Sequence, residues 1–191
     1  MTDLSGLASL SGVTSFTYDA IRGLLYVTTS AGILYAWDPA AGSAAWSLDV
    51  GGSLSSVALS PDGTFVLVGD STVTTDSGGQ NHTTIDRVDL SSRTVTRLDV
   101  AVGGPSEQGI AHVAIASNGE ALFTRDHLGS GWNPFREFSA SASTVNPAIV
   151  SGLPEVTQST YLQSSEHDRY ILVGEANETG TPLAILRLSY R

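Results

Sequence analysis

Three carboxylates occupy matching places along this 191-residue chain, each at the end of a short apolar run. Asp70 ends the run LVGD, Asp126 follows LFTR, and Glu175 ends the run LVGE. Calcium prefers several oxygen ligands, so carboxylates repeated at one position of a repeating fold could gather such a cation. The simpler alternative is that these acids cap strand ends and keep a loop solvated. We expect no cofactor, with calcium or another divalent cation as the alternative.

Two histidines lie near these acids and widen the range of metals that the chain could bind. His82 follows Asp70 in a long polar segment, and His127 adjoins Asp126. With imidazole added to carboxylates, zinc or manganese becomes conceivable. Trp132, in the segment GSGWNP, could instead stack on a sugar or a peptide.

The sequence indicates no catalytic residue. The chain has no cysteine, which excludes disulfides, thiolate zinc sites and a cysteine nucleophile. It contains no GxSxG string, no HExxH string and no phosphate-binding glycine loop. Serine is so common that spacing alone supports no Ser-His-Asp arrangement. The sequence therefore leaves open whether the protein is an enzyme, and the missing catalytic motifs argue against it.

The charge of the chain argues against nucleic acid as a partner. The net charge is −10, and the nine basic residues are scattered arginines, whereas a nucleic-acid-binding domain carries a basic stripe. No run reaches the roughly 18 apolar residues of a spanning helix, so we expect no membrane insertion. The start, MTDLSGLASLSG, lacks the basic and apolar regions of a Sec signal peptide. The acidity, the missing lysine and cysteine, and the Gly/Ser/Thr-rich loops resemble exported bacterial surface proteins, so we expect an extracytoplasmic or secreted location.

The clearest structural element is the hairpin SSVALSPDGTFVLVG at residues 55–69. Val57 and Leu59 alternate with smaller or polar residues, which is the period-two pattern of a half-buried strand. Pro61, Asp62 and Gly63 then supply the residue types that a tight turn needs. A nearly all-apolar second strand follows.

Related units of four short strands recur, with their second strands roughly 40 to 55 residues apart. That period is typical of propeller blades, which must stack around an axis to bury their apolar faces. We therefore expect an all-β fold, namely a β-propeller of about four four-stranded antiparallel blades. The blades span about 13–52, 54–104, 110–152 and 158–191. A plain β-sandwich is the alternative.

The strings ALSPDGTFVLVGD and VAIASNGEALFTRD resemble the repeat of the bacterial YVTN and WD-repeat-like propellers. YVTT at 26–29 occupies the place of the YVAN-like string, and Trp37 and Asp38 form a WD-like pair. The resemblance implies a fold and no particular activity. Propellers of this family generally have more blades than the four expected for this chain. The chain is therefore either part of a larger propeller or a small closed one, in which residues 2–12 would complete the last blade.

In propellers of this family, the loops between second and third strands share a face with the loops between blades, and that face is the usual ligand platform. The resemblance thus implies a ligand- or partner-binding face made by Asp70, His82, Asp126, His127, Trp132 and Glu175. We expect a non-catalytic interaction or scaffold module that presents this face to a protein or glycan. One alternative is a propeller enzyme, a lactonase-like hydrolase or a quinone-dependent dehydrogenase, with a cation on the axis. Another is a fragment whose function lies elsewhere in the parent chain.

Overall fold

The computed structural model of the chain describes residues 5–104, 106–128, 134–150, 160–164, 170–175 and 183–187. Trp132 lies outside these residues, and the side chain of Glu175 is not described. The described residues form β-strands and one short 3-10 helix. None of their helices is long and apolar enough to cross a membrane.

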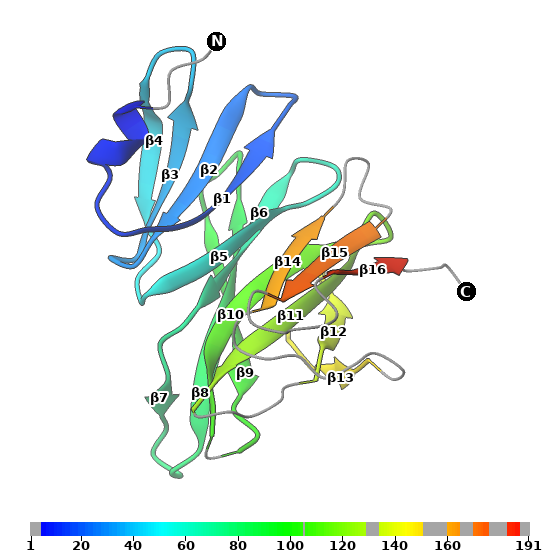
Figure 1. Cartoon of the computed structure of the whole chain (residues 1–191). Helices are drawn as coiled ribbons and strands as arrows, with labels where there is room; N and C mark the ends of the chain where they lie inside the picture. The colour runs from blue at the N-terminus through cyan, green and yellow to red at the C-terminus, as the bar shows by residue number, and fades with distance from the viewer. Residues whose placement is uncertain are drawn as a thin grey trace.

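Four antiparallel sheets follow one another along the chain (Figure 1). The first sheet contains β1 (Val13–Asp19), β2 (Leu24–Thr29), β3 (Ile33–Asp38) and β4 (Ser43–Asp49). The second contains β5 (Leu54–Leu59), β6 (Phe65–Asp70), β8 (Asn81–Asp89) and β9 (Val95–Ala101), with the short β7 (Thr74–Thr75) beside β8. The third contains β10 (Glu107–Ile115), β11 (Glu120–His127), β12 (Arg136–Ser139) and β13 (Ala148–Ile149). The fourth contains β14 (Thr160–Ser164), β15 (Tyr170–Glu175) and β16 (Leu183–Arg187).

Within each sheet the main strands pair in the order in which they occur in the sequence. The expected all-β fold of antiparallel sheets is therefore confirmed, and the arrangement of the four sheets is propeller-like. Two details differ from the expectation of four strands per unit. The polar segment after Asp70 contributes the extra strand β7, and the fourth sheet has three strands among the described residues.

Local turn chemistry explains the strand boundaries of the central hairpin. Gly63 has a φ of 67°, a left-handed conformation that glycine adopts without steric cost. The Asp62 carboxylate accepts hydrogen bonds from the Thr64 N–H at 3.0 Å and from the Ser60 hydroxyl at 2.7 Å. These contacts fix the turn between β5 and β6 and hence the register in which Val57 lies opposite Val68.

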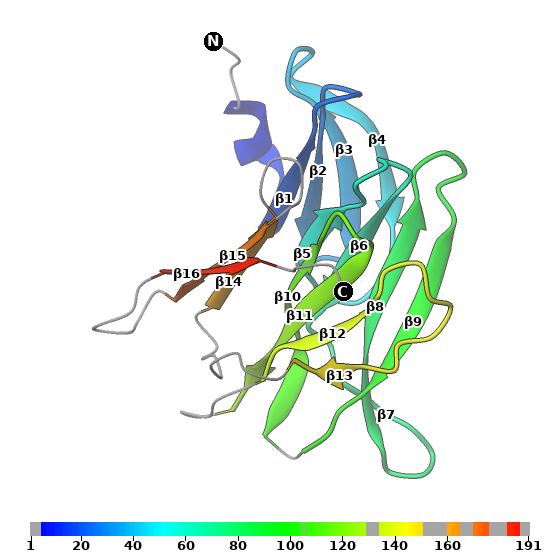
Figure 2. The same cartoon turned by 90° about the vertical axis from the view of Figure 1, so that its right-hand side faces the viewer.

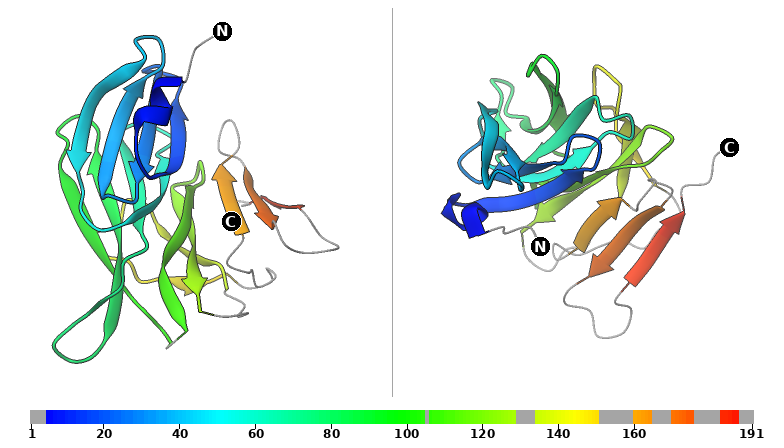
Figure 3. Two further views of the ribbon diagram at one scale, coloured as in Figure 1. Left: turned by 60° about the vertical axis from the view of Figure 1, so that its left-hand side comes forward. Right: turned by 90° about the horizontal axis from the view of Figure 1, so that it is seen from above.

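Neighbouring sheets pack face to face and bury three apolar layers, which we call the seams. The first seam joins the first and second sheets through residues such as Tyr26 and Val66. The second joins the second and third sheets around Leu67 and Phe123, and the third joins the third and fourth sheets around Leu122. The first strand of each sheet lies next to the first strand of the following sheet, so β1, β5, β10 and β14 form the inner lining of the molecule (Figure 3).

The N-terminal segment packs on the first sheet. The 3-10 helix η1 (Ser5–Ser9) lies on the face that points away from the second sheet, where Leu7 and Leu10 contact Leu25, Val27 and Trp37 (Figure 2). This placement differs from the expectation that residues 2–12 complete the last blade, because the described part of the segment forms a helix at the other end of the row. The apolar face of the first sheet, left without a neighbouring sheet, gives these leucines a surface to cover.

Candidate axial binding pocket

One pocket of about 440 Å³ lies where the inner strands of all four sheets converge. Its wall consists of the ends of β1 and β5, part of β10 and the end of β14, together with the turns that follow β1 and β5. Binding pockets for small ligands range from roughly 300 to 1,000 Å³, so this pocket could hold a monosaccharide or one or two amino-acid side chains. Because it lies on the axis of the propeller-like row, we call it the axial pocket.

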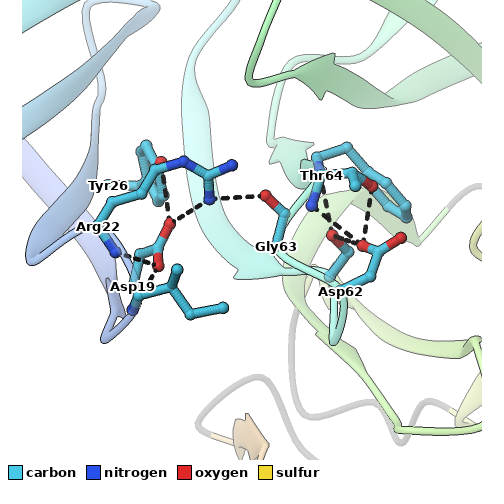
Figure 4. Close-up of polar contacts among 9 residues, drawn as sticks. Asp19, Arg22, Tyr26, Asp62, Gly63 and Thr64 are labelled. Carbon is cyan, nitrogen blue, oxygen red and sulfur yellow. Dashed lines mark hydrogen bonds and ion pairs between the residues drawn. The ribbon is translucent and has the colours of Figure 1, made fainter.

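Asp19 is the one charged side chain among the described residues that line the axial pocket, and all its acceptor positions are engaged (Figure 4). Its Oδ1 accepts hydrogen bonds from the backbone N–H groups of Ile21 and Arg22, at 2.9 and 3.0 Å. Its Oδ2 accepts one from Arg22 Nη1 at 2.7 Å and one from the Tyr26 hydroxyl at 3.3 Å. Arg22 Nη1 also donates to the carbonyl of Gly63 at 2.8 Å, which ties the first sheet to the second beside the pocket.

These contacts set the charge of the pocket rim. Burial alone would raise the pKa of Asp19, but the hydrogen bonds and the positive charge of Arg22 hold that pKa below its usual value. Burial, together with the Asp19 charge, raises the pKa of Tyr26 to about 12. At neutral pH the rim therefore carries a carboxylate already neutralised by Arg22 and a phenol that stays protonated.

The remaining wall is apolar or uncharged. Val57, Val113 and Leu162 supply apolar surface from three different sheets. Thr17 and Gln163 add uncharged donors and acceptors. The axial pocket can therefore accept hydrogen bonds and apolar contact from a ligand, and it offers no free charge to attract an ion.

Asp70, which the sequence places on a binding face, lies at the opposite end of the inner strands from the axial pocket. It pairs with Leu54 at the start of β5, whereas the pocket lies at the ends of β1 and β5. Its buried carboxylate accepts hydrogen bonds from the backbone N–H groups of Ser53 and Thr72, at 2.9 and 2.8 Å. These bonds hold the connection between the first and second sheets, which is a structural use of the carboxylate.

Asp126, His127 and Glu175 stand at the corresponding ends of β11 and β15. His127 lies opposite Glu107 at the start of β10, and Glu175 lies opposite Thr160 at the start of β14. Burial raises the pKa of Asp126. The structure thus places the expected acids at one end of the sheets, and it shows no contact between Asp70 and Asp126 among the described residues.

His82 lies at the start of β8, between two carboxylates of its own sheet. Its Nε2 is 3.3 Å from Asp76 Oδ2, and its Nδ1 is 2.7 Å from Asp99 Oδ2. The two acids face opposite nitrogens of one ring, so they cannot share a metal ion with it. Across the described part of the chain, no three His, Asp or Glu side chains are grouped so that they could hold a metal ion.

A buried charge cluster at the end of β11 is a feature that the sequence analysis missed. Arg125 is 1% exposed, and its Nε lies 3.8 Å from Glu107 Oε2, while Arg136 donates to the other oxygen of Glu107. Burial lowers the pKa of Arg125 to about 10, against the effect of Glu107. Arg125 also donates to the Ala101 carbonyl at 2.6 Å, so the cluster holds the second and third sheets together. The sequence feature that could have revealed this cluster is Arg125 in the run LFTRD. The corresponding runs of two other units, LVGD and LVGE, contain no arginine.

The comparisons with known proteins support the fold alone. No protein-family model matches the chain, and no curated protein matches it. Among solved structures, the computationally designed Ika4 protein matches over 95% of this chain and 96% of its own, with 13% identity and a TM-score of 0.55. Hydrazine synthase of Kuenenia stuttgartiensis matches over 95% of this chain and 64% of its own, with 13% identity and a TM-score of 0.49. Identities this low carry no information on activity.

Proposed function

We propose that the four sheets are blades of a YVTN- or WD-repeat-like propeller and that the chain is a non-catalytic interaction module. A protein or glycan partner inserts an uncharged group into the axial pocket. The observation that carries this proposal is the engagement of Asp19, the one charged side chain of the described wall, by four hydrogen bonds. A pocket whose charge is satisfied internally favours an uncharged occupant, because a charged one would lose its hydration without gaining a partner.

The face at the opposite end of the inner strands is the other candidate surface for a partner. There Asp70 is committed to backbone N–H groups, and His82 lies between Asp76 and Asp99. These side chains have structural partners, whereas in the axial pocket the Gln163 amide nitrogen makes one long hydrogen bond, to the Ser164 carbonyl at 3.4 Å, and its amide oxygen can accept from a ligand. The pocket is therefore the better-supported site.

The proposal is tested by selecting ligands and then filling the pocket. The immobilised chain is presented with a displayed library of random peptides and, separately, with a glycan array. Ala20 is exposed and lines the pocket, so Ala20→Trp fills the pocket from the surface. We expect this variant to bind the selected ligand roughly tenfold more weakly or worse.

Ala41→Trp is the matched control, since Ala41 is exposed in the turn between β3 and β4, away from the pocket. It should bind like the wild type. Selected ligands that bind Ala20→Trp as tightly as the wild type would show that the pocket is not the site. Failure to select any ligand from either library would count against an interaction module.

A further inference from the structure

The face of the first sheet that points away from the second sheet is built like the face of a seam, and we call it the outer face. Residues that lie opposite each other on paired strands project from the same side of a sheet. Phe16 and Tyr18 of β1 lie opposite residues of β2, which in turn lie opposite residues of β3. The outer face therefore carries six apolar or aromatic side chains: Phe16, Tyr18, Leu25, Val27, Tyr35 and Trp37.

Equivalent positions in the next two sheets are buried against a preceding sheet. Phe16 on the first strand of its sheet lies opposite Val27 on the second strand. The equivalent pair is Val57 and Val68 in the second sheet, and Val113 and Phe123 in the third. Val57 is 6% exposed and Val113 is 3% exposed, because each packs into a seam. Phe16, in contrast, is 62% exposed and Tyr18 is 56% exposed. The outer face is thus built like a seam surface, and no sheet of the described residues packs on it.

Helix η1 covers only part of this face. Leu7 and Leu10 pack on Leu25, Val27 and Trp37, which leaves the β1 side open. The contact is close, since a Cβ added at Gly6 would lie 2.7 Å from a ring atom of Trp37. A larger side chain at this position would therefore lift η1 from the outer face.

The other end of the row carries the complementary surface. The fourth sheet packs one face on the third sheet through Leu162, Ile171 and Val173. Its opposite face bears Tyr161, which is 59% exposed although its ring centroid lies 5.4 Å from that of His112 on β10, and Gln163, which lies opposite Leu172. The corresponding face of the second sheet, with Ala58 opposite Leu67, is the one buried against the third sheet. Among the described residues, no sheet packs on this face of the fourth sheet.

We propose that the outer face of the first sheet docks the fourth sheet of a second copy of this chain, so that two chains close one ring. The two surfaces are the two halves of a seam that already occurs three times within the chain. A head-to-tail contact of this kind closes when a two-fold axis repeats it, and both terminal surfaces are then covered. Helix η1 occupies part of the docking surface and competes with the second copy.

The test is sedimentation velocity over a concentration series of the full chain. The wild type should show a reversible monomer–dimer equilibrium. Phe16→Glu and Tyr161→Glu, on the two sides of the proposed seam, should each weaken dimerisation roughly tenfold or more, because burying a charge against apolar surface is unfavourable. Ile149→Glu is the control, since Ile149 is 64% exposed on β13, and it should dimerise like the wild type. Gly6→Val should strengthen dimerisation by releasing η1.

Mixing the two weakened variants separates this proposal from other dimers. In an equimolar mixture, the intact outer face of Tyr161→Glu can dock the intact fourth sheet of Phe16→Glu, which restores one of the two seams. The mixture should therefore associate more strongly than either variant alone. Wild type and Gly6→Val that both stay monomeric would overturn the proposal, as would a dimer unaffected by Phe16→Glu or a mixture without rescue. Circular dichroism of each variant establishes that it is folded.

Discussion

Three turns of the first two sheets share the same pattern of hydrogen bonds to an aspartate. They are Asp19–Gly23, Asp38–Gly42 and Asp89–Arg93. In each, the Asp Oδ1 accepts the backbone N–H groups two and three residues later, and the Asp carbonyl accepts the N–H four residues later. The last residue has a positive φ of 68°, 64° and 59°, respectively. Aspartate at the first position thus fixes the turn, and the fifth position requires a positive φ, which glycine supplies in two of these turns and Arg93 in the third.

Gly42→Ala should destabilise the protein by about 1 kcal/mol, because alanine is strained at a φ of 64°. No atom lies within 4 Å of the added Cβ, so the loss reports backbone strain alone. Gly104→Ala is the control, since its Cβ also meets nothing within 4 Å and its φ is not positive. Urea unfolding should show the loss only for Gly42→Ala. Equal effects of the two substitutions would mean that the turn conformation is not the cause.

Tyr26 should make the protein sensitive to alkaline pH. Its pKa is about 12 in the folded chain and 10.0 in the absence of burial, so folding favours the neutral phenol. The resulting stability is fully present below pH 10 and is lost as the pH rises through 12, a change of about 3 kcal/mol. Urea unfolding from pH 9 to 12 should show a smaller alkaline loss for Tyr26→Phe than for the wild type. Parallel pH profiles would contradict this account of Tyr26.

At the scale of elements, the sheets are joined by polar contacts that bridge the edges of the apolar seams. In the first seam, Arg97 of β9 pairs with Asp86 of β8 at 3.1 Å and donates to the Val50 carbonyl of the preceding connection at 2.8 Å. Asp86 is fully buried, and burial raises its pKa despite the pairing with Arg97. The arginine therefore neutralises a carboxylate that has no access to water.

Arg97→Met should destabilise the chain by about 2–3 kcal/mol at neutral pH, because it leaves Asp86 buried without its partner. The value is below that of a fully buried pair, since the Arg97 side chain is 55% exposed. Arg87→Met is the control and should lose less than 1 kcal/mol, because Arg87 lies at a partly exposed site on the opposite face of the second sheet from Asp86. Thermal unfolding checks both. A small effect of Arg97→Met would mean that water reaches Asp86.

The sequence predicts the hairpins well because the residues that specify each strand and turn lie close together in the chain. The hairpin expected at residues 55–69 is observed as the strands Leu54–Leu59 and Phe65–Asp70, and the expected turn residues Asp62 and Gly63 have turn roles. The helix η1 could not be predicted, because Leu7 and Leu10 form it against a sheet face that exists only after folding. The axial pocket is equally non-local, since residues as distant as Asp19 and Ser164 share its wall.

The expected site residues illustrate the same limit. Asp70 is the last residue of β6 and Asp126 the last but one of β11. The pairing with the first strand of each sheet makes Arg125, and not Asp126, the counterpart of Asp70. Sequence repetition cannot show that the Asp70 carboxylate is committed to Ser53 and Thr72, because those contacts depend on how the connection between sheets folds back. A charge that looks available in the sequence can therefore be fully engaged in the structure.

At the scale of the whole molecule, the described residues form a row of four sheets with three buried seams between them and a terminal surface at each end. The inner strands meet at the axial pocket, and the terminal surfaces carry exposed aromatic side chains such as Phe16 and Tyr161. Tyr18 and Gln163 belong to both the pocket wall and the terminal surfaces, whereas the test residues Ala20, Phe16 and Tyr161 each belong to one of them. Ligand binding at the axis and pairing of two chains are therefore tested with separate variants.

The central claim is that a partner binds at the axial pocket and not at the opposite end of the inner strands. The most direct measurement is amide hydrogen–deuterium exchange with and without a ligand selected by the peptide library or the glycan array. We predict that protection rises around Asp19 and Ser60, at the ends of β1 and β5. Protection confined to the end that carries Asp70 and Asp126 would contradict the claim and assign binding to the loop face.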